Sequence, residues 1–531
     1  MHPSALAKRL YIFLFVIISI LYFYGLGRLP LLGPDEPRYA QVAREMLLRG
    51  DLITPTLGGH TWFEKPALLY WLMMASFKIF GVGEWGARFG SAICGLLTIA
   101  AVWCVGRAVE RTSTEARDFG FWSTLVMASS LGLVVFSRAA SFDIVITMTT
   151  TWALGFFLLH ELSPQKRSAL LIGFYICVGL SLLAKGLVGI VIPFGVVGFY
   201  FLLRRSWPRR AVWLSLIWGV PIAIAVSALW YGPVIARHGW SFVNEFFIQH
   251  HFARYVSNKY RHPQPIYFYP AIILMLALPW SAFLVHSLVK ARGWTWRGSD
   301  SLSVVRVFSL AWLVLPIVFF SFSGSKLPGY ILPALPAAAF LIAGGFNRSV
   351  VKWPLRATGV ICLALAAGGF VYALQSQQIS VECAAVIAAP LVIVAIVSFL
   401  SPDDARSRLR ICGATALLVL VVLACAAPPV AQRESVKDLL RLADARGYAN
   451  APVLAQRSDD RTAQFYAHDR VVYNADGEPI TFDEVSLEQA RALGPRLVVF
   501  IPAEYADQFS GAANIEILGD NGRIAVLGWK P

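Results

Sequence analysis

Long apolar runs alternate with short polar breaks along most of the chain, from Leu10 to Pro428. Each run holds roughly 17 to 25 mostly apolar residues, the length that an α-helix needs to cross the hydrocarbon core of a bilayer. The pattern therefore predicts about thirteen membrane-spanning helices. The predicted spans are residues 10–29, 87–109, 119–137, 143–160, 168–184, 187–203, 211–231, 266–289, 303–323, 329–346, 356–374, 383–400 and 411–428.

Composition agrees with a membrane protein. Apolar residues make up 57% and charged residues 15% of the 531 residues, and the mean hydropathy is +0.62, which lies outside the range of soluble globular enzymes. The formal net charge of +15 could indicate nucleic-acid binding. However, Lys and Arg cluster in the breaks between apolar runs, as the positive-inside rule describes. No nucleic-acid partner is therefore predicted.

The basic residues also set the orientation of the predicted helices. With the N-terminus inside, the inner segments hold 21 Lys and Arg residues, whereas the four short outer turns hold only Arg138, Lys185 and Lys326. Thirteen spans then place the C-terminus outside. A further apolar run, residues 67–80, is too short to span and is expected at the outer interface. The three outer cations have two interpretations: they bind an anionic ligand, or they are snorkelling anchors near helix ends.

The cysteines lie within or beside apolar runs, and their spacing fits no metal-binding motif. We interpret them as small core residues and predict no disulfide among them. They are Cys94, Cys104, Cys177, Cys362, Cys383, Cys412 and Cys425.

Two larger outer segments, about residues 30–86 and 232–265, are rich in charged and aromatic residues. In the first, Gly-Pro-Asp-Glu-Pro-Arg-Tyr-Ala at residues 33–40 predicts the start of a helix. Asp35 can cap this helix, and Asp35, Arg38 and Tyr39 would share one helix face. A cap without chemical function is the alternative interpretation of Asp35.

Candidate ligand-binding residues continue along both segments. Trp-Phe-Glu-Lys-Pro at residues 62–66 places an acid and a base beside two aromatic rings. In the second segment, His251 and Arg254 would face the same way on a helix. Histidine, arginine and carboxylates at a membrane surface can hold a phosphate, directly or through a divalent cation. Ordinary polar surface is the alternative for the histidines.

The last hundred or so residues have a different pattern. From about residue 434 the hydropathy falls, and short strand-like runs alternate with helix-like ones. Residues 1–430 are therefore predicted to form the membrane domain, and residues 431–531 a small soluble α/β domain outside the membrane. The C-terminal domain contains no recognisable catalytic motif.

Three motifs carry a resemblance to a known family. They are Asp-Glu-Pro-Arg-Tyr-Ala at residues 35–40, Phe-Glu-Lys-Pro at residues 63–66, and Ser-Lys-Leu-Pro-Gly-Tyr-Ile-Leu-Pro at residues 325–333. Together they resemble the polyprenyl-phosphate-dependent glycosyltransferases of the GT-C superfamily, and within it the bacterial aminoarabinose transferases that modify lipid A. The likeness covers the whole chain, including the C-terminal domain.

This resemblance implies a multi-pass α-helical protein of the bacterial inner membrane, with its active site and C-terminal α/β domain in the periplasm. The implied reaction moves a sugar, 4-amino-4-deoxy-L-arabinose in the first interpretation, from undecaprenyl phosphate to a lipid A phosphate with inversion. The protein is expected to be a monomer. Other sugars, and protein or glycan acceptors, are also compatible with the superfamily. A lipid-carrier flippase is the alternative of a different class.

The resemblance also assigns roles to individual residues. Asp35 would be the main catalytic carboxylate and Asp143 a second acid at the site. Glu64 and His251 would bind a divalent metal, either zinc or magnesium or manganese. The residues expected to bind or support the substrates are Arg38, Tyr39, Trp62, Lys65, Arg138, Lys185, Arg254, Lys326 and Tyr330.

Overall fold

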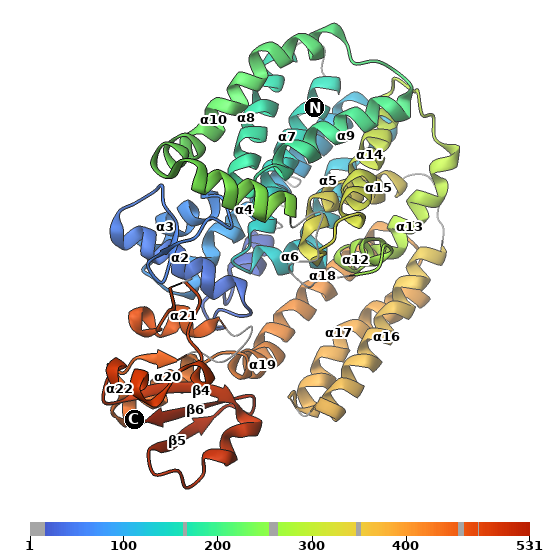
Figure 1. Cartoon of the computed structure of the whole chain (residues 1–531). Helices are drawn as coiled ribbons and strands as arrows, with labels where there is room; N and C mark the ends of the chain where they lie inside the picture. The colour runs from blue at the N-terminus through green and yellow to red at the C-terminus, as the bar shows by residue number, and fades with distance from the viewer. Residues whose placement is uncertain are drawn as a thin grey trace.

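The chain forms a bundle of long α-helices with a small mixed sheet at one end (Figure 1). This computed structural model describes residues 16–162, 167–253, 264–346, 352–376, 378–454, 461–475 and 477–531. The side chains of residues 250–253 lie outside this description.

Within these residues, nine helical stretches are long and apolar enough to cross a membrane. This number and the length of the helices confirm the predicted multi-pass membrane protein. The helices that form these stretches are α4 (Glu84–Thr112), α7 (Phe142–Leu162), α8 (Arg167–Lys185), α10 (Arg210–Val243), α14 (Ser301–Ser321), α15 (Leu335–Gly345) with the preceding turn η4 (Pro328–Ala334), α16 (Lys352–Ser376), α17 (Val381–Leu400) and α18 (Ala405–Val421).

Two predicted spans are bent helix pairs. The helices α5 (Phe119–Ser129) and α6 (Leu131–Ser137) meet at 57°. Residues 266–289 do not form the continuous span that was predicted, because α12 (Phe268–Leu276) and α13 (Ser281–Val289) meet at 120°. Pro279 lies between α12 and α13 and has no N–H to continue a helix. A shorter apolar helix, α9 (Val188–Arg204), corresponds to another predicted span.

Residues 10–29 and 211–231 are two of the predicted spans. The first predicted span begins outside the described residues and is helical over residues 16–23. Helix α10 continues past the predicted end of its span at residue 231 and is recorded as far as Val243, with a kink inside it. The backbone leaves the helical region at Gly239, with φ 57°. The π-helix η2 (Asn244–Ala253) follows.

The first outer segment contains helix α2 (Asp35–Arg49), the hairpin β1 (Thr56–Leu57) and β2 (His60–Thr61), and helix α3 (Leu68–Phe80). The prediction that Asp35 caps α2 was wrong. Pro34 is the N-cap residue and no side chain caps the helix. Because Asp35 is the first helical residue, its carboxylate is available for other contacts.

The C-terminal region is a small α/β domain, as predicted. Its sheet has the order β3-β4-β6-β5, with β3 (Val453–Leu454) parallel to β4 (Leu497–Pro502). Strand β6 (Ile524–Trp529) pairs antiparallel with β4 and with β5 (Ile515–Asp520). The helices α19 (Ala427–Arg433), α20 (Lys437–Ala443) and α22 (Leu487–Leu493) accompany this sheet.

A short helix of this domain, α21 (Thr462–Tyr466), docks directly on α2 (Figure 1). The Tyr466 hydroxyl accepts a hydrogen bond from the Leu31 N–H at 2.7 Å and donates one to Glu84 at 2.9 Å. Arg44 on α2 is buried and donates to the Phe465 carbonyl at 3.0 Å. The C-terminal domain is thus attached to the helix that carries Asp35.

A disulfide joins Cys383 near the start of α17 to Cys425 in η5 (Val422–Ala426), with a Cα–Cα distance of 5.8 Å. The prediction that the chain has no disulfide was therefore wrong. The two cysteines are 42 residues apart, and they meet only because α17 and α18 pack as neighbours. The remaining five cysteines are free and buried or half-buried.

Candidate active site

A polar cavity of about 210 Å³ lies where the outer segments meet the ends of the membrane helices. Several predicted site residues from distant parts of the chain line this cavity. They are Asp35 and Tyr39 on α2, Glu64 and Lys65 before α3, Asp143 at the start of α7, Lys185 at the end of α8, and Tyr330 in η4.

Arg38 does not line the cavity itself, but it holds acidic side chains that do. Its guanidinium donates to Asp35 Oδ1 at 2.6 Å and lies 3.4 Å from Glu64 Oε2. Lys65 Nζ donates to Glu64 Oε1 at 2.8 Å. The Arg38 side chain is 13% exposed, whereas that of Asp35 is 51% exposed. Arg38 therefore holds the Asp35 carboxylate from the protein side and leaves it accessible.

Aromatic rings enclose this acid and base cluster. The Arg38 guanidinium lies 5.2 Å from the Trp62 ring centroid and 5.5 Å from that of Tyr39, within range of a cation–π contact. Burial, together with the nearby Asp35 carboxylate, raises the pKa of Tyr39 well above its ordinary value. Tyr39 is therefore a neutral phenol at the cavity wall.

Another part of the cavity is organised around Asp143. Lys185 donates to Asp143 Oδ1 in a short contact, and Lys185 Nζ lies 4.5 Å from the Tyr330 ring centroid. Gly329 packs directly against this pair, because a Cβ added there would lie 2.0 Å from Asp143 Oδ2. The motif at residues 325–333 thus contributes the Tyr330 ring and the close backbone contact at Gly329.

The charges of the cluster balance. Asp35, Glu64 and Asp143 carry three negative charges, and Arg38, Lys65 and Lys185 carry three positive charges. Each carboxylate has a basic neighbour within ion-pair distance. A phosphate that enters the cavity can therefore replace a carboxylate as the ion-pair partner of a basic side chain. It would not meet a large excess of positive or of negative charge.

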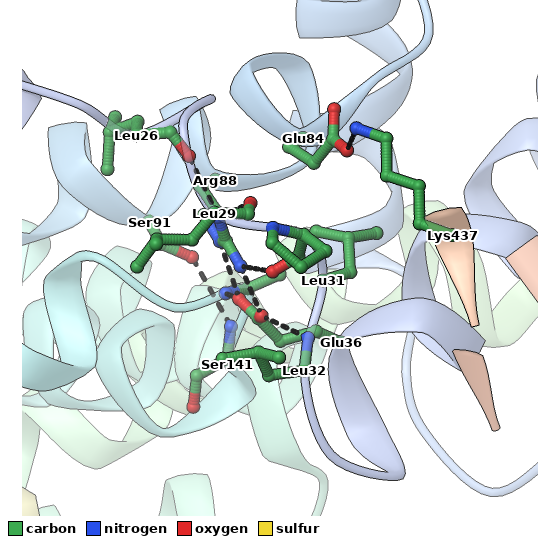
Figure 2. A network of polar contacts seen from close by, with 12 residues as sticks. Leu26, Leu29, Leu31, Leu32, Glu36, Glu84, Arg88, Ser91, Ser141 and Lys437 are labelled. Carbon is green, nitrogen blue, oxygen red and sulfur yellow. Dashed lines mark hydrogen bonds and ion pairs between the residues drawn. The ribbon is translucent and has the colours of Figure 1, made fainter. Parts of the chain in front are cut away.

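A further ion pair, which the sequence did not single out, joins Glu36 in the wall of this cavity to Arg88 (Figure 2). Glu36 accepts two hydrogen bonds from Arg88, at 2.9 and 2.7 Å. It also accepts from the Leu32 N–H at 2.9 Å and the Ala140 N–H at 2.7 Å. Glu36 and Arg88 are both buried. This pair connects α2 to the loop before Asp143, and so fixes the two acid-bearing elements relative to each other.

Arg88 extends the same network to the N-terminal segment. It donates to the carbonyl oxygens of Leu26, Leu29 and Pro30 at 2.7 to 2.8 Å (Figure 2). The sequence signal for this network is weak. Glu36 adjoins a motif residue, but Arg88 lies inside a predicted apolar span, where a charged residue requires a buried partner.

Other predicted residues lie elsewhere. Lys326 is 9% exposed and donates to the Gln264 carbonyl at 2.9 Å, and it does not line the polar cavity. Trp62 contacts Arg38 but does not line the cavity either. Arg138 lies in the wall of a second cavity. Arg254 and the side chain of His251 fall outside the described residues.

The described residues do not test the predicted metal site, because the side chain of His251 lies outside them. Within the residues that the structure describes, no group of three or more His, Cys, Asp and Glu side chains could hold a metal ion. Glu64 already contacts both Lys65 and Arg38, and a divalent cation would have to compete with these two positive charges. Metal binding therefore remains a prediction, and no step proposed below depends on it.

A larger and mostly apolar cavity, of about 560 Å³, adjoins the polar one. The two cavities share Glu36, Val135 and Ala139 in their walls. The larger cavity is lined by the N-terminal segment, by α6, and by residues of α16, α17, α18 and η5, with Pro279 of the α12–α13 bend. Its size lies within the range of about 300 to 1,000 Å³ that is usual for ligand pockets.

The helical bundle and the charged cavity at its outer segments together define a multi-pass membrane protein of the GT-C glycosyltransferase class. The chain belongs to the dolichyl-phosphate-mannose-protein mannosyltransferase family, whose sequence model matches residues 8–285. This match confirms the superfamily that the sequence motifs indicated.

Individual relatives are similar to this chain over about three-fifths of its length. An uncharacterized protein of Aquifex aeolicus is 31% identical over 342 residues, covering 64% of this chain and 65% of that protein. The undecaprenyl phosphate-alpha-4-amino-4-deoxy-L-arabinose arabinosyl transferase of Serratia proteamaculans is 31% identical over 340 residues, covering 62% of this chain and 58% of that protein. The matched region thus spans about three-fifths of the length of these relatives.

Solved structures support the fold over nearly the full length. The crystal structure of ArnT from Cupriavidus metallidurans bound to undecaprenyl phosphate is 23% identical, covers 98% of each chain and has a TM-score of 0.77. The same protein in the apo state has a TM-score of 0.73. At this level of identity, the likeness establishes the GT-C fold.

Proposed function

We propose that this chain is an inverting glycosyltransferase that moves a sugar from undecaprenyl phosphate to a lipid acceptor. The best candidates are 4-amino-4-deoxy-L-arabinose as the sugar and a lipid A phosphate as the acceptor. One observation carries the proposal: a cavity lined by acidic and basic side chains, among them the accessible Asp35, adjoins an apolar cavity large enough for a lipid chain. The names of the relatives support the choice of sugar and carrier.

We place the reaction at the periplasmic face of a bacterial inner membrane. Lys185 and Asp143 lie at the helix ends that the positive-inside rule assigns to the outer side. The Cys383–Cys425 disulfide joins helix ends on that side, and disulfides persist in oxidising compartments such as the bacterial periplasm. Both observations favour this orientation.

In the proposed mechanism, the basic side of the cavity receives the carrier phosphate. Lys65, Lys185 and Tyr330 can contact its oxygens, and the negative charge that grows on the leaving phosphate is stabilised better in this partly dehydrated site than in water. Arg254 is predicted to add a further positive charge.

Asp35 directs the acceptor. An acceptor oxygen attacks the anomeric carbon while the bond from that carbon to the phosphate oxygen breaks, and the electron pair leaves with undecaprenyl phosphate. One displacement inverts the anomeric configuration. Asp35 accepts the proton of a hydroxyl acceptor, whereas a phosphate acceptor is largely ionised at neutral pH and needs orientation more than deprotonation.

Replacing Asp35 tests this mechanism. Asp35→Asn in reconstituted full-length protein is expected to lower sugar transfer roughly 100-fold or more, with an unchanged melting temperature. The matched control is Asp438→Asn, because Asp438 forms the same type of i,i+3 pair with Arg441 on an exposed surface. A folded Asp35→Asn protein with full activity would contradict the assignment.

Mass spectrometry of lipid A tests the substrates. Lipid A from cells that contain the active protein is expected to gain the mass of a pentosamine, and lipid A from cells with Asp35→Asn is not. A hexose, or a modified protein, would instead assign the chain to a related transfer reaction. Lipid movement across vesicles without a new glycosidic bond would favour the flippase alternative.

A further inference from the structure

Arg138 lies at the edge of the apolar cavity where this cavity meets the polar one. It follows α6 directly, and the next residue, Ala139, lines both cavities. The guanidinium is half-buried. It donates to the carbonyl oxygens of Leu21 at 2.7 Å, Tyr22 at 3.3 Å and Tyr24 at 2.6 Å. These bonds use at most three of the five N–H groups of a guanidinium.

Within the described part of the chain, no carboxylate pairs with the positive charge of Arg138. Among the residues that the structure describes, no Asp or Glu oxygen lies within 4.0 Å of its guanidinium nitrogens. The neighbouring Arg88 differs, because Glu36 neutralises it through two hydrogen bonds. Burial, and to a smaller extent the charge of Arg88, lower the pKa of Arg138 to about 10. Arg138 therefore remains charged at neutral pH beside an apolar cavity.

An unneutralised cation at the head of an apolar cavity matches one kind of molecule, an anionic lipid. We propose that Arg138 binds a phosphate group of the acceptor lipid, and that an acyl chain of this lipid occupies the apolar cavity. The proposal rests on the function proposed above and adds a binding residue and a chain-binding cavity for the acceptor.

The positions of the charges favour the acceptor over the donor. The basic residues suited to the donor phosphate, Lys65 and Lys185, line the polar cavity, and neither lines the apolar one. Arg138 lines only the apolar cavity. Glu36, Val135 and Ala139 line both cavities, so a lipid in the apolar cavity would lie directly beside the cavity that Asp35 lines.

Direct binding tests the proposal without requiring turnover. Full-length protein in nanodiscs is titrated with diphosphorylated lipid A, with chemically dephosphorylated lipid A and, separately, with undecaprenyl phosphate. Arg138→Gln is expected to weaken binding of phosphorylated lipid A roughly 10- to 100-fold, because a hydrogen bond to a charged group contributes about 1.5 to 3 kcal/mol. Its affinities for dephosphorylated lipid A and for undecaprenyl phosphate are expected to stay unchanged.

Two further variants separate binding from folding. Ala414 is buried in the wall of the apolar cavity, so Ala414→Phe is expected to weaken binding of both forms of lipid A while leaving Arg138 in place. Arg204→Gln is the matched control. Arg204 is also half-buried and donates to a carbonyl oxygen, that of Gly298 at 3.0 Å, but it lines neither cavity.

The outcomes distinguish the two proposals. Unchanged binding of phosphorylated lipid A by folded Arg138→Gln and Ala414→Phe would overturn the acceptor site, and so would a loss confined to undecaprenyl phosphate. Failure of the wild-type protein to transfer sugar, with lipid A binding that depends on Arg138, would overturn the proposed reaction alone. In steady-state kinetics, Arg138→Gln is expected to raise KM for the acceptor and to leave KM for the donor unchanged.

Discussion

Gly329 shows how closely the backbone approaches the candidate active site. A Cβ at this position would lie 2.0 Å from Asp143 Oδ2 and 2.8 Å from a ring carbon of Phe136. The Asp143 carboxylate is also held by Lys185 and cannot move freely. The glycine is needed for space, and its neighbour Tyr330 then reaches the Lys185 ammonium group.

We predict that Gly329→Ala lowers sugar transfer at least about tenfold and costs about 1 to 3 kcal/mol of stability, because the added methyl group must displace Asp143. Transfer rates and the melting temperature of the purified protein measure both effects. Gly198→Ala is the control. Gly198 is inside α9, and no described atom beyond its own stretch of helix lies within 4 Å of an added Cβ, so alanine should leave activity unchanged and stabilise slightly. Equal behaviour of the two variants would contradict the prediction.

At the residue level, the sequence motifs predicted which side chains meet, but they did not predict the hydrogen-bond network around Glu36 and Arg88. Asp35, Lys65 and Tyr330 each belong to a short motif and do line one cavity. Glu36 and Arg88 are 52 residues apart, and no local pattern pairs them. Arg138 was predicted to contact a substrate, but no motif indicated that its bonds to the Leu21, Tyr22 and Tyr24 carbonyls would hold it in the wall of the apolar cavity.

At the scale of elements, the contact between α2 and α21 depends on an unusual pair. The Arg44 guanidinium lies 2.6 Å from His468 Nδ1, so this nitrogen must be unprotonated to accept. Burial first, and then the charge of Arg44, lower the pKa of His468 below its ordinary value of 6.5. Asp469, Arg470 and Asp444 are the other charged groups that act on it.

The sign of the pH effect follows from this lowered pKa. Between the pKa of His468 in the unfolded chain and its lowered pKa in the folded one, the unfolded chain binds more protons. The stabilisation that unprotonated His468 contributes is therefore full above pH 6.5 and is lost as pH falls through the folded pKa. We predict that docking of the C-terminal domain weakens on acidification. Hydrogen exchange of peptides that contain Leu31 and residues 461–467, compared between about pH 8 and about pH 5 after correction for intrinsic exchange, measures this effect.

His468→Asn provides the control. The residue has φ 55°, a conformation that Asn adopts more readily than most residues, and an amide oxygen can still accept from Arg44 without titrating. The variant should lose the part of the pH dependence that His468 causes. The same acid-induced exchange in both proteins would contradict the prediction.

Helix lengths followed from the hydrophobic pattern, whereas bends did not. The 21 residues of α7 match the predicted span of residues 143–160 to within two residues at each end. Residues 266–289 are equally apolar, but the chain turns by 120° around Pro279. An apolar run specifies burial in a bilayer or protein interior and does not determine whether the chain crosses or turns back.

At the scale of the whole molecule, the helices α16 and α17 lie at the edge of the bundle (Figure 1). They pack chiefly on each other, and α17 also packs on α18 and α16 on α13. Residues of α16, α17 and α18 form one wall of the apolar cavity. The Cys383–Cys425 disulfide fastens this wall near one end.

We predict that alkylation of the denatured, unreduced protein labels five cysteines, and that labelling after reduction reaches all seven. Peptide mass spectrometry identifies the pair. The double variant Cys383→Ser, Cys425→Ser should lower the free energy of unfolding by less than the roughly 4 kcal/mol that a chain-entropy model gives for this disulfide. The reason is that the packing of α17 against α18 in the membrane already keeps the two positions close. Seven reactive thiols without reduction would contradict the disulfide.

The contact made by Tyr466 has a consequence for biosynthesis. Every described residue of the polar cavity, from Asp35 to Tyr330, leaves the ribosome well before Tyr466. Until then the Leu31 amide and the Glu84 carboxylate lack their hydroxyl partner. A nascent chain that stops after its membrane helices is therefore inserted but incomplete at α2, and translation of the last hundred residues completes the support of the helix that carries Asp35.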